Sequence, residues 1–569
     1  MSDSSSRTGV IPVVAAARLK AAARGKPKGR AQDPQAQAQV RALLGADPRR
    51  RDLLIEYLHR IQDAYGHISA AHIVALAAEL KLAMTEVYEV ATFYHHFDVV
   101  KEDDALPPRF TVRVCDSLSC RMAGAEELRQ SLDKLSLKDV RVVPAPCVGR
   151  CHAAPVAVVG RNPVDRASAA SVVRAVREQA ITPALTSYID YPAYRKAGGY
   201  EAFRQCMAGA RSGEAVIQIM EHSGLRGLGG AGFPAGRKWR IVGAEPEPRL
   251  MAVNIDEGEP GTFKDRWYLE RDPHRFIEGM LIAARIVGIA EIYIYLRDEY
   301  AGCREILTRE LAALRAEPPC ALPPIHLRRG AGAYICGEES AMMESIEGRR
   351  GMPRLRPPYV AQVGLFGRPT LEHNMETLYW VRDILEKGAE WFAGHGRNGR
   401  CGLRSFSVSG RVQKPGVHLA PAGITLRELI AEYCGGMLPG HQLYAYLPGG
   451  ASGGILPAAL ADLALDFDTL AEHGCFIGSA AIIVLSQHDK ARDAAANMLQ
   501  FFADESCGQC TPCRVGTEKA AALMLAPKWD QVLLGDLAQA MADASICGLG
   551  QAAPNPIRSV IKYFPREIE

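Results

Sequence analysis

Three cysteines near the C-terminal end place the strongest constraint on how this chain can fold. Cys507, Cys510 and Cys513 follow C-x2-C-x2-C spacing in the segment ESCGQCTPC, and Cys547 comes in a later segment. One short loop with this spacing can wrap three corners of a cubane, and a fourth thiolate completes the ligand set of a 4Fe–4S cluster. The pattern favours such a cluster, with Cys547 as fourth ligand, over a zinc site or unbound structural cysteines.

A second set of four cysteines lies nearer the N-terminus. Cys115 and Cys120 form a C-x4-C pair, and Cys147 and Cys151 form a C-x3-C pair. Each pair follows a predicted strand, so the two pairs can converge at one end of a sheet. Four thiolates match a 2Fe–2S cluster, and a zinc ribbon, which normally has tighter C-x2-C knuckles, is the alternative.

The bulk composition excludes several classes of protein. A length of 569 residues exceeds one core and predicts three or four domains, and a net charge of +3 gives no support to nucleic-acid binding. No apolar run approaches the roughly 20 residues of a membrane span, and the N-terminus lacks the apolar core of a signal peptide. The odd number of cysteines, 15, suits metal clusters in a reducing compartment. We therefore expect a cytoplasmic protein that binds no nucleic acid and does not insert directly into a membrane.

Residues 1–34 are predicted to form a basic flexible tail. Six lysines and arginines fall between positions 18 and 30, and the next acidic residue is Asp33. Such a charge run is typical of a solvated, poorly ordered segment, with partner docking as a secondary possibility. An organelle presequence or a patch that binds anionic surfaces is the alternative.

The remaining patterns predict an order of structural units. Apolar residues recur at helical spacing from Gln37 to Phe97, and FTVRVC, a helix over 125–137, RVVPAP and PVAVVG then indicate a small α/β domain. Over residues 200–400, glycine-rich loops separate buried strands from helices, an α/β pattern with phosphate-binding character. Short strands in SFSVSGRV and YAYLPGG predict a compact β-rich domain, and the chain is mostly helical from about residue 489.

Glycine-rich and acidic segments supply the candidate binding residues. The stretch GLRGLGGAGFPAGRKW contains G-x-G-x-x-G, which is a weak signal alone, together with Phe233 as a flat apolar face and Lys238 as a phosphate partner. A plain packing loop is the alternative. Acidic and amide groups crowd a predicted strand end in VNIDEGEPGTFKDR, where ligands bind in open α/β sheets. Glu338 and Glu339 follow another glycine turn, and either could instead open a helix.

Five segments together resemble the flavin-bearing, NADH-oxidising subunit of respiratory complex I and its relatives. They are GLRGLGGAGFP, NIDEGEPGTFKDR, GAGAYICGEES, PTLEHNMET and ESCGQCTPC. The N-terminal part, with ATFYHHFD and the two cysteine pairs, resembles the thioredoxin-like 2Fe–2S subunit that accompanies it. The resemblance covers nearly everything from about residue 37 onward and implies that both are fused in one chain.

This resemblance implies a multidomain α/β fold with six segments. The predicted segments are a basic tail (1–34), a helical bundle (35–104), a thioredoxin-like 2Fe–2S domain (105–182), a Rossmann-like FMN- and NAD-binding domain (183–400), a small β-grasp-like domain (401–488) and a C-terminal helical bundle with the 4Fe–4S cluster (489–569).

The resemblance also implies the cofactors and their binding residues. A nicotinamide exchanges two electrons as hydride whereas iron–sulfur clusters take one at a time, so FMN is required between NAD and the clusters. The 2Fe–2S cluster is expected to act as a side reservoir, and electrons are expected to run through the 4Fe–4S cluster. The cofactor-binding residues so implied are Gly227, Gly229, Gly230, Lys238, Asn254, Asp256 and Asn374 for FMN, Glu257, Glu259, Tyr334, Gly337, Glu338 and Glu339 for flavin and nicotinamide, and Phe233 and Tyr359 for NAD.

Three positions depart from the family pattern. Ile241 stands where some relatives carry a second adenine-stacking aromatic, and His373 replaces the first of two adjacent asparagines. Arg356 replaces a lysine, which keeps the charge but alters the hydrogen-bond geometry. The adenine-stacking and phosphate contacts are therefore expected to differ in detail from those of the family.

Further segments suggest the electron partner. GRNGRCGLRSFSVSGRV, LPGGASGGILP and ASICGLGQAAPNP resemble most the β subunit of NAD-dependent, metal-containing formate dehydrogenases. All four N-terminal cluster cysteines are present, whereas the fusion in NAD-reducing hydrogenases tends to lose them. This implies a diaphorase that reduces NAD+ with electrons from a catalytic α subunit carrying molybdenum or tungsten and further iron–sulfur clusters. A nickel–iron hydrogenase, a complex I-like quinone reductase and a zinc-stabilised scaffold are the alternatives.

Overall fold

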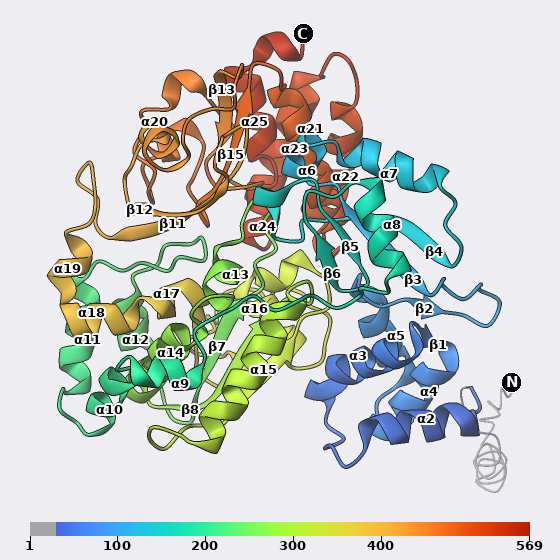
Figure 1. Cartoon of the computed structure of the whole chain (residues 1–569), viewed down its shortest axis with the longest axis vertical. Helices are drawn as coiled ribbons and strands as arrows, with labels where there is room; N and C mark the ends of the chain where they lie inside the picture. Colours follow the sequence, from blue (N-terminus) through green and yellow to red (C-terminus); the bar gives the residue numbers. More distant parts are fainter. Residues whose placement is uncertain (1–29) are drawn as a thin grey trace, which may run out of the picture.

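The computed structural model describes residues 30–569, so the predicted basic tail lies outside the described residues except for its last five positions. Figure 1 shows a helical N-terminal part, a small sheet domain beside the C-terminal helices, and a larger α/β part that joins them. Within the described range, no helix is both long and apolar enough to cross a membrane.

Four helices and a two-stranded parallel sheet form the N-terminal part. Asp33 caps the first helix, and the second ends at Gly66, whose φ of 75° suits glycine. The last helix of this part begins at Met84. The elements are α2 (Pro34–Leu44), η1 (Arg51–Leu53), α3 (Leu54–Tyr65), β1 (Ile68–Ser69), α4 (Ala70–Leu80), α5 (Met84–Phe93) and β2 (Val99–Val100).

A four-stranded mixed sheet of order β4-β3-β5-β6 forms the next part. Its central strand β3 (Phe110–Cys115) pairs in parallel with β4 (Val140–Ala145) and antiparallel to β5 (Ala157–Val159). Val112 and Val114 of β3 are buried in a core of their own with helices α7 and α8. The other elements are α6 (Leu118–Met122), α7 (Ala125–Lys134), η2 (Cys151–Ala153), β6 (Asn162–Val164) and α8 (Ala169–Arg177).

The central part contains a fully parallel sheet of order β10-β7-β8-β9. Its strands are β7 (Arg249–Ile255), β8 (Ile289–Leu296), β9 (Ile325–Arg329) and β10 (Thr370–Asn374), and the apolar helix α14 (Pro273–Val287) is almost wholly buried. The chain moves outward from β7 to β9 and then returns to the other side of β7, so the strand order reverses between β7 and β10. Ligands bind at such switch points.

Helices and short turns surround this sheet. They are α9 (Tyr191–Lys196), α10 (Glu201–Met207), α11 (Gly213–His222), α12 (Ala235–Gly243), α13 (Lys264–Leu269), α15 (Ala301–Ala316), η3 (Tyr334–Gly337), α16 (Glu339–Ile346), η4 (Leu365–Gly367), α17 (Met375–Tyr379), α18 (Val381–Lys387) and α19 (Ala389–Ala393).

A five-stranded sheet and a helical C-terminal part complete the chain. The sheet has order β12-β11-β15-β13-β14, and the C-terminal helices pack against its strands through apolar side chains. The sheet part holds β11 (Leu403–Gly410), β12 (Gly416–Pro421), α20 (Leu426–Glu428), η5 (Leu429–Tyr433), β13 (Leu443–Leu447), β14 (Leu456–Pro457), η6 (Ala458–Leu460), η7 (Ala471–His473) and β15 (Ala481–Ser486). The C-terminal part holds α21 (Ala491–Asp504), α22 (Thr511–Met524), α23 (Gln531–Ala544), α24 (Gly548–Ala552), α25 (Asn555–Tyr563) and η8 (Pro565–Glu567).

Candidate functional site

A cavity of about 360 Å³ lies at the carboxyl ends of β7 and β10, where the strand order reverses. Asn254 is the last residue but one of β7 and Asn374 ends β10, and the two residues are direct partners in the parallel ladder. The structure thus brings together two predicted residues that are 120 positions apart. The predicted residues that line the cavity are Gly229, Gly230, Asn254, Asp256, Glu257, Glu259, Tyr334, Gly337, Glu338 and Asn374.

The other side of the cavity comes from segments that the sequence analysis did not assign to this site. Loops of the five-stranded sheet part and helix α24 close over the strand ends. Lys264, Asp265 and Ser452 fall inside motifs quoted for the family resemblance, so those motifs held a signal for them. The lining residues that were missed are Ala231, Gly258, Thr262, Lys264, Asp265, Ile335, Gly449, Ser452, Phe476, Gly478, Ser479, Gly548, Leu549 and Ala552.

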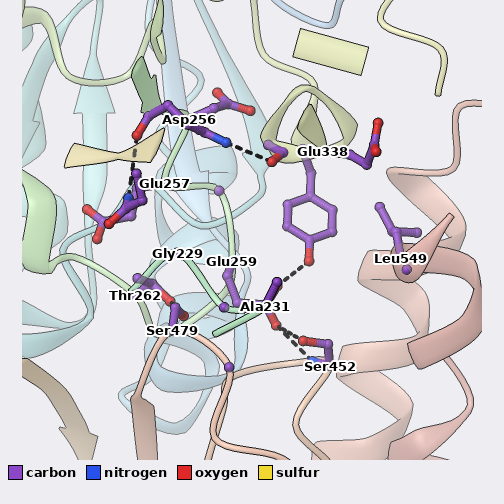
Figure 2. Close-up of a pocket in the computed structure, with 18 of the residues that line it drawn as sticks. Gly229, Ala231, Asp256, Glu257, Glu259, Thr262, Glu338, Ser452, Ser479 and Leu549 are labelled. Atoms are coloured by element: carbon purple, nitrogen blue, oxygen red, sulfur yellow. Dashed lines mark hydrogen bonds between the residues drawn. The ribbon is translucent and has the colours of Figure 1, made fainter. Parts of the chain in front are cut away.

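Glu259 ties two parts of the chain together across the cavity (Figure 2). Its Oε1 accepts bonds from the backbone N–H and the hydroxyl of Ser452, both at 2.8 Å. Its Oε2 accepts the Tyr334 hydroxyl, so the carboxylate is fixed from both sides. Burial raises the pKa of Glu259 against the lowering effect of these donors.

A charged network forms the floor of the cavity beside β10. Lys264, 1% exposed, places its Nζ 2.8 Å from Asp265 Oδ1 and 3.1 Å from Glu376 Oε2. Burial opposes the charge on Lys264, but the two carboxylates outweigh it and raise its pKa. Burial and the charge of Asp265 raise the pKa of Glu257 to about 7. Glu257 can therefore hold or release a proton near neutral pH.

Asp256 carries a polar atom with no partner in the described chain. Its Oδ2 is buried and makes no hydrogen bond, and burial raises the pKa of this carboxyl well above its ordinary value. Figure 2 shows its side chain among the other cavity residues. A buried polar atom that is left unpaired costs free energy, so this oxygen indicates that the cavity is built for a polar ligand.

The glycine loop before α12 approaches the strand ends closely. A Cβ on Gly229 would lie 2.9 Å from Cβ of Asn374, and Gly230 has a φ of +136°. Only glycine satisfies both demands without strain, and the bare backbone can approach a ligand in the cavity. The loop is therefore more than a packing turn.

Five predicted residues lie outside the cavity lining. Lys238 donates to the backbone oxygen and the carboxylate of Glu372, both at 2.9 Å, so its charge is already paired. Two aromatic side chains are exposed, Phe233 by 38% and Tyr359 by 57%. Glu338 caps α16 through Ser340 and Ala341, as the helix-opening alternative expected, and also lines the cavity. The five outside the lining are Gly227, Phe233, Lys238, Glu339 and Tyr359.

The four N-terminal cysteines converge in the structure. They lie at the end of β3, in α6, after β4 and at the start of η2, and each is at most 5% exposed. The thiols of Cys147 and Cys151 are 3.3 Å apart, and the pKa of Cys115 is raised by hydrogen bonds to Cys120 and Cys147. All 15 cysteines of the chain are free thiols. Four buried, converging thiols fit a 2Fe–2S cluster.

The four C-terminal cysteines also lie close to one another. Cys507 and Cys510 lie in the loop before α22, Cys513 lies in its first turn, and Cys547 directly precedes α24. Burial raises the pKa of Cys547 to about 12, with Cys507 and Cys513 contributing to the shift. Helix α24, which directly follows Cys547, lines the cavity with several of its residues. This thiol set therefore lies close to the cavity, with only this short helix between them. These thiols fit a 4Fe–4S cluster.

One buried arginine connects the cavity with the N-terminal thiol set. Arg297 donates to the backbone oxygen of Cys147 at 2.7 Å and to the backbone oxygen of Glu257, and it pairs with Glu299 at 3.1 Å. Arg266 likewise donates to Gly149 O at 3.0 Å. The thiol loop is therefore held directly against the loop that forms the cavity.

Comparisons with known families agree with this arrangement. Four family models match the chain: thioredoxin-like 2Fe–2S ferredoxin (residues 40–180), Nuo51 FMN-binding domain (220–383), SLBB domain (405–456) and NADH-ubiquinone oxidoreductase-F iron-sulfur binding region (493–569). The F 2 subunit of the NADH-quinone oxidoreductase of Rhizobium meliloti is 38% identical over 406 residues, which is 68% of this chain and 96% of that protein. The corresponding F subunit of Aquifex aeolicus is 39% identical over 66% of this chain and 90% of that protein.

A solved structure matches more of the chain. A chain of an NAD+-reducing nickel–iron hydrogenase in the H2-reduced state superposes with a TM-score of 0.81 at 31% identity. The match covers 91% of this chain and 93% of that chain. The predicted multidomain α/β fold is therefore confirmed.

These findings define an NAD-dependent oxidoreductase subunit of the diaphorase type, with FMN, one 2Fe–2S cluster and one 4Fe–4S cluster as its cofactors. It is a subunit of a multi-subunit NADH dehydrogenase assembly. The chain belongs to the family of NADH-quinone oxidoreductase F subunits, here fused to a thioredoxin-like 2Fe–2S domain.

Proposed function

We propose that this chain is the electron-transfer subunit of an NAD-dependent formate dehydrogenase. It reduces NAD+ with electrons that a partner catalytic subunit, carrying molybdenum or tungsten and further iron–sulfur clusters, takes from formate. The fusion itself supports a role in NAD+ reduction, because the hydrogenase chain that matches along 91% of this chain belongs to an NAD+-reducing enzyme.

The observation that carries the formate assignment is the intact N-terminal thiol set. All four cysteines are present and buried together, whereas the family resemblance described above implies that hydrogenase-type fusions tend to lose them. Two of the three segments that resemble formate dehydrogenase β subunits also contribute to the cavity, through Gly449 and Ser452 and through Leu549. The similarity therefore extends to the walls of the cofactor site.

We assign the cofactors to the sites by the donor groups present. FMN is held in the cavity by the residues of the glycine loop and of the β7 and β10 ends, and the exposed aromatic faces of Phe233 and Tyr359 are available to the adenine of NAD. The predicted residues Gly227, Lys238 and Glu339 support this site from outside its lining. The 2Fe–2S ligands are Cys115, Cys120, Cys147 and Cys151, and the 4Fe–4S ligands are Cys507, Cys510, Cys513 and Cys547.

When bound, FMN supplies the exchange between two-electron hydride transfer and single-electron transfer. The chain's own residues bind and orient the cofactor and shield the cavity from water. Tyr334 and Ser452 fix the Glu259 carboxylate at the cavity wall, and the side chains of Phe476 and Leu549 help to exclude water from it. The carboxyl of Glu257, with its pKa of about 7, can hold or release a proton near neutral pH. The Tyr300 hydroxyl and the Asp265 N–H donate hydrogen bonds to this group and fix its position.

Elemental analysis of the native complex, isolated anaerobically through this chain, tests the proposal. Molybdenum or tungsten beside iron, together with formate-dependent NAD+ reduction, is the expected result. Nickel would instead assign the chain to a hydrogenase, and iron alone would assign it to a complex I-like NADH dehydrogenase. The second candidate function is that of a subunit of a nickel–iron hydrogenase. It is favoured by the match to the hydrogenase chain, which covers 91% of this chain.

We also infer a cytoplasmic location. None of the 15 cysteines forms a disulfide, which fits a compartment that keeps thiols reduced and iron–sulfur clusters intact. Detection of the native complex in the periplasmic fraction of cells would contradict this inference.

A further inference from the structure

A second cavity, of about 260 Å³, lies where three parts of the chain meet. Its walls come from the thioredoxin-like sheet, from the loop between α5 and β2, and from the loop that follows β8. It shares no lining residue with the FMN cavity. A ligand here would therefore contact the N-terminal helical part through its last loop, the thioredoxin-like domain and the central α/β part at the same time.

The sheet presents a charged face to this cavity. Residues of β3 alternate in direction, so Val112 and Val114 are buried in the domain's own core while Thr111 and Arg113 line the cavity. Arg141 of the neighbouring strand β4 lines it as well. A sheet face covered by other domains is usually apolar, so arginines in this position require a polar partner.

Arg113 lacks such a partner within residues 30–569. The other two arginines of the lining are paired, Arg141 with Asp98 and Arg161 with Asp63. No hydrogen bond or ion pair of the described residues involves the side chain of Arg113, although it is only partly exposed. A partly buried cation that forms no direct ion pair is costly to keep.

The opposite wall carries two carboxylates, Asp298 and Glu299, and both are already paired with cations. Asp298 is contacted by His96 at 2.7 Å, by Arg329 at 2.5 Å and by Arg304 at 3.2 Å, and Glu299 pairs with Arg297 at 3.1 Å. The pKa of Arg304 is lowered by burial and by the charge of Arg329. The guanidinium groups around this junction therefore crowd one another.

A metal ion is the obvious alternative occupant. His59, His96 and Asp298 place ligand atoms within 4.8 Å of one another, and His59 Nδ1 is buried with no partner in the described chain. However, the Arg304 and Arg329 guanidinium groups contact the same Asp298 carboxylate and would repel a dication at that point. The carboxylates of the lining are each paired with an arginine, whereas Arg113 pairs with none, so an anion suits the cavity better than a cation.

We propose that this cavity is a binding site for a small oxyanion with two negative charges, of the size of inorganic phosphate. Arg113 is its main counter-ion, because a guanidinium group matches the oxygen geometry of such anions. A bound dianion would join the 2Fe–2S domain to the other two parts of the chain and stabilise their contact in proportion to its concentration.

Isothermal titration calorimetry of the full-length chain with inorganic phosphate, at constant ionic strength, tests the proposal. Saturable binding is expected for the native chain and for the control R109Q, which removes an exposed arginine next to β3. R113Q is expected to bind at least about tenfold more weakly, and R113K, which keeps the charge, within about threefold of the native chain. Flavin content and the electron paramagnetic resonance (EPR) signal of the 2Fe–2S cluster verify that each variant is folded.

Unchanged phosphate binding in R113Q, or the absence of saturable binding in the native chain, would overturn the proposal. Saturable Zn²⁺ binding that is lost in H59Q, without any phosphate binding, would assign the cavity to a metal instead. If R113Q does not fold, cryo-electron microscopy of the native chain with and without phosphate decides. Phosphate-dependent density beside Arg113 supports the proposal, and its absence contradicts it.

Discussion

The two thiol sets assigned to iron–sulfur clusters flank the cavity that we assign to FMN, but they differ in exposure. The four N-terminal thiols are each at most 5% exposed, whereas Cys507 and Cys510 are only partly buried. An electron donor or acceptor on another chain has to come close to a cluster, so the C-terminal set is suited to exchange electrons with a partner. The N-terminal set is suited to a cluster that exchanges electrons only inside the chain.

The two regions are also attached to the cavity in different ways. Helix α24 carries Cys547 at its start and lines the cavity itself, so the connection is part of one continuous segment. The N-terminal set depends on contacts between domains, chiefly those of Arg297 and Arg266 with the Cys147–Cys151 loop. A comparison of variants on the two sides can therefore separate electron flow from domain docking.

Removal of the C-terminal cluster is expected to have the largest effect. C547A should retain FMN but lose the 4Fe–4S cluster, because three thiolates remain where four are needed. Electron flow between NAD(H) and the partner subunit should fall by more than about 100-fold, beyond the loss typical of changes in outer-shell partners. Low-temperature EPR and a turnover assay measure both effects, and an unchanged EPR spectrum would refute the ligand assignment.

The carboxyl of Glu257 should make stability depend on pH. Its folded pKa of about 7 exceeds its ordinary value of 4.5, so the folded chain binds this proton more tightly than the unfolded chain does. The stability this provides is complete below pH 4.5 and is lost as the pH rises through about 7. Relative to E257Q, the flavin-free native chain should lose about 3 kcal/mol of unfolding free energy across that interval.

Urea unfolding of both chains between about pH 5 and pH 8 measures this difference. The difference between the native chain and E257Q cancels the pH dependence that comes from all other titratable groups, since these groups are common to both chains. Parallel stability curves for the two chains would show that Glu257 titrates at an ordinary pKa.

Arg297 is expected to tune the 2Fe–2S cluster. R297M removes a buried cation that bonds to the backbone of a cluster ligand, so the reduced cluster loses electrostatic stabilisation. The ratio of reduced to oxidised cluster at a fixed potential should fall about tenfold, which equals about 59 mV for one electron. An EPR-monitored redox titration measures this ratio.

R328M is the matched control, because Arg328 is a buried arginine that pairs with Asp52 at 2.7 Å and does not contact the thiol loops. It should leave the 2Fe–2S potential unchanged. The same shift in both variants would mean that general loosening of the domains, and not the charge of Arg297, moves the potential.

The smallest effect on electron flow is expected from the N-terminal thiols. C151A should lose the 2Fe–2S signal while electron flow between NAD(H) and the partner changes by less than about twofold, because a buried side cluster does not lie on the exit route. The turnover assay used for C547A measures it. A loss as large as that in C547A would remove the distinction between the two regions.

Sequence reasoning succeeded where a function depends on a short segment. The cysteine spacings and the strand-end amides Asn254 and Asn374 pointed to residues that the structure brings together. It was less complete where the cavity is closed by distant segments, since Ser452 and Leu549 line it from more than 190 residues beyond Asn254. Lys264 was also missed although it lies in a family motif, because its residue type and spacing do not show that it will be buried between two carboxylates.

The sequence by itself determined the cluster types, the glycine loop and the order of the structural units, because spacing, backbone freedom and hydrophobic periodicity act over a few neighbouring residues. Only the tertiary structure decided that Lys238 pairs with Glu372, that Arg297 joins the loops of Glu257 and Cys147, and that Arg113 faces a cavity and forms no ion pair in the described chain. These contacts join different loops and domains, so they depend on how whole domains pack and on which charges that packing leaves paired.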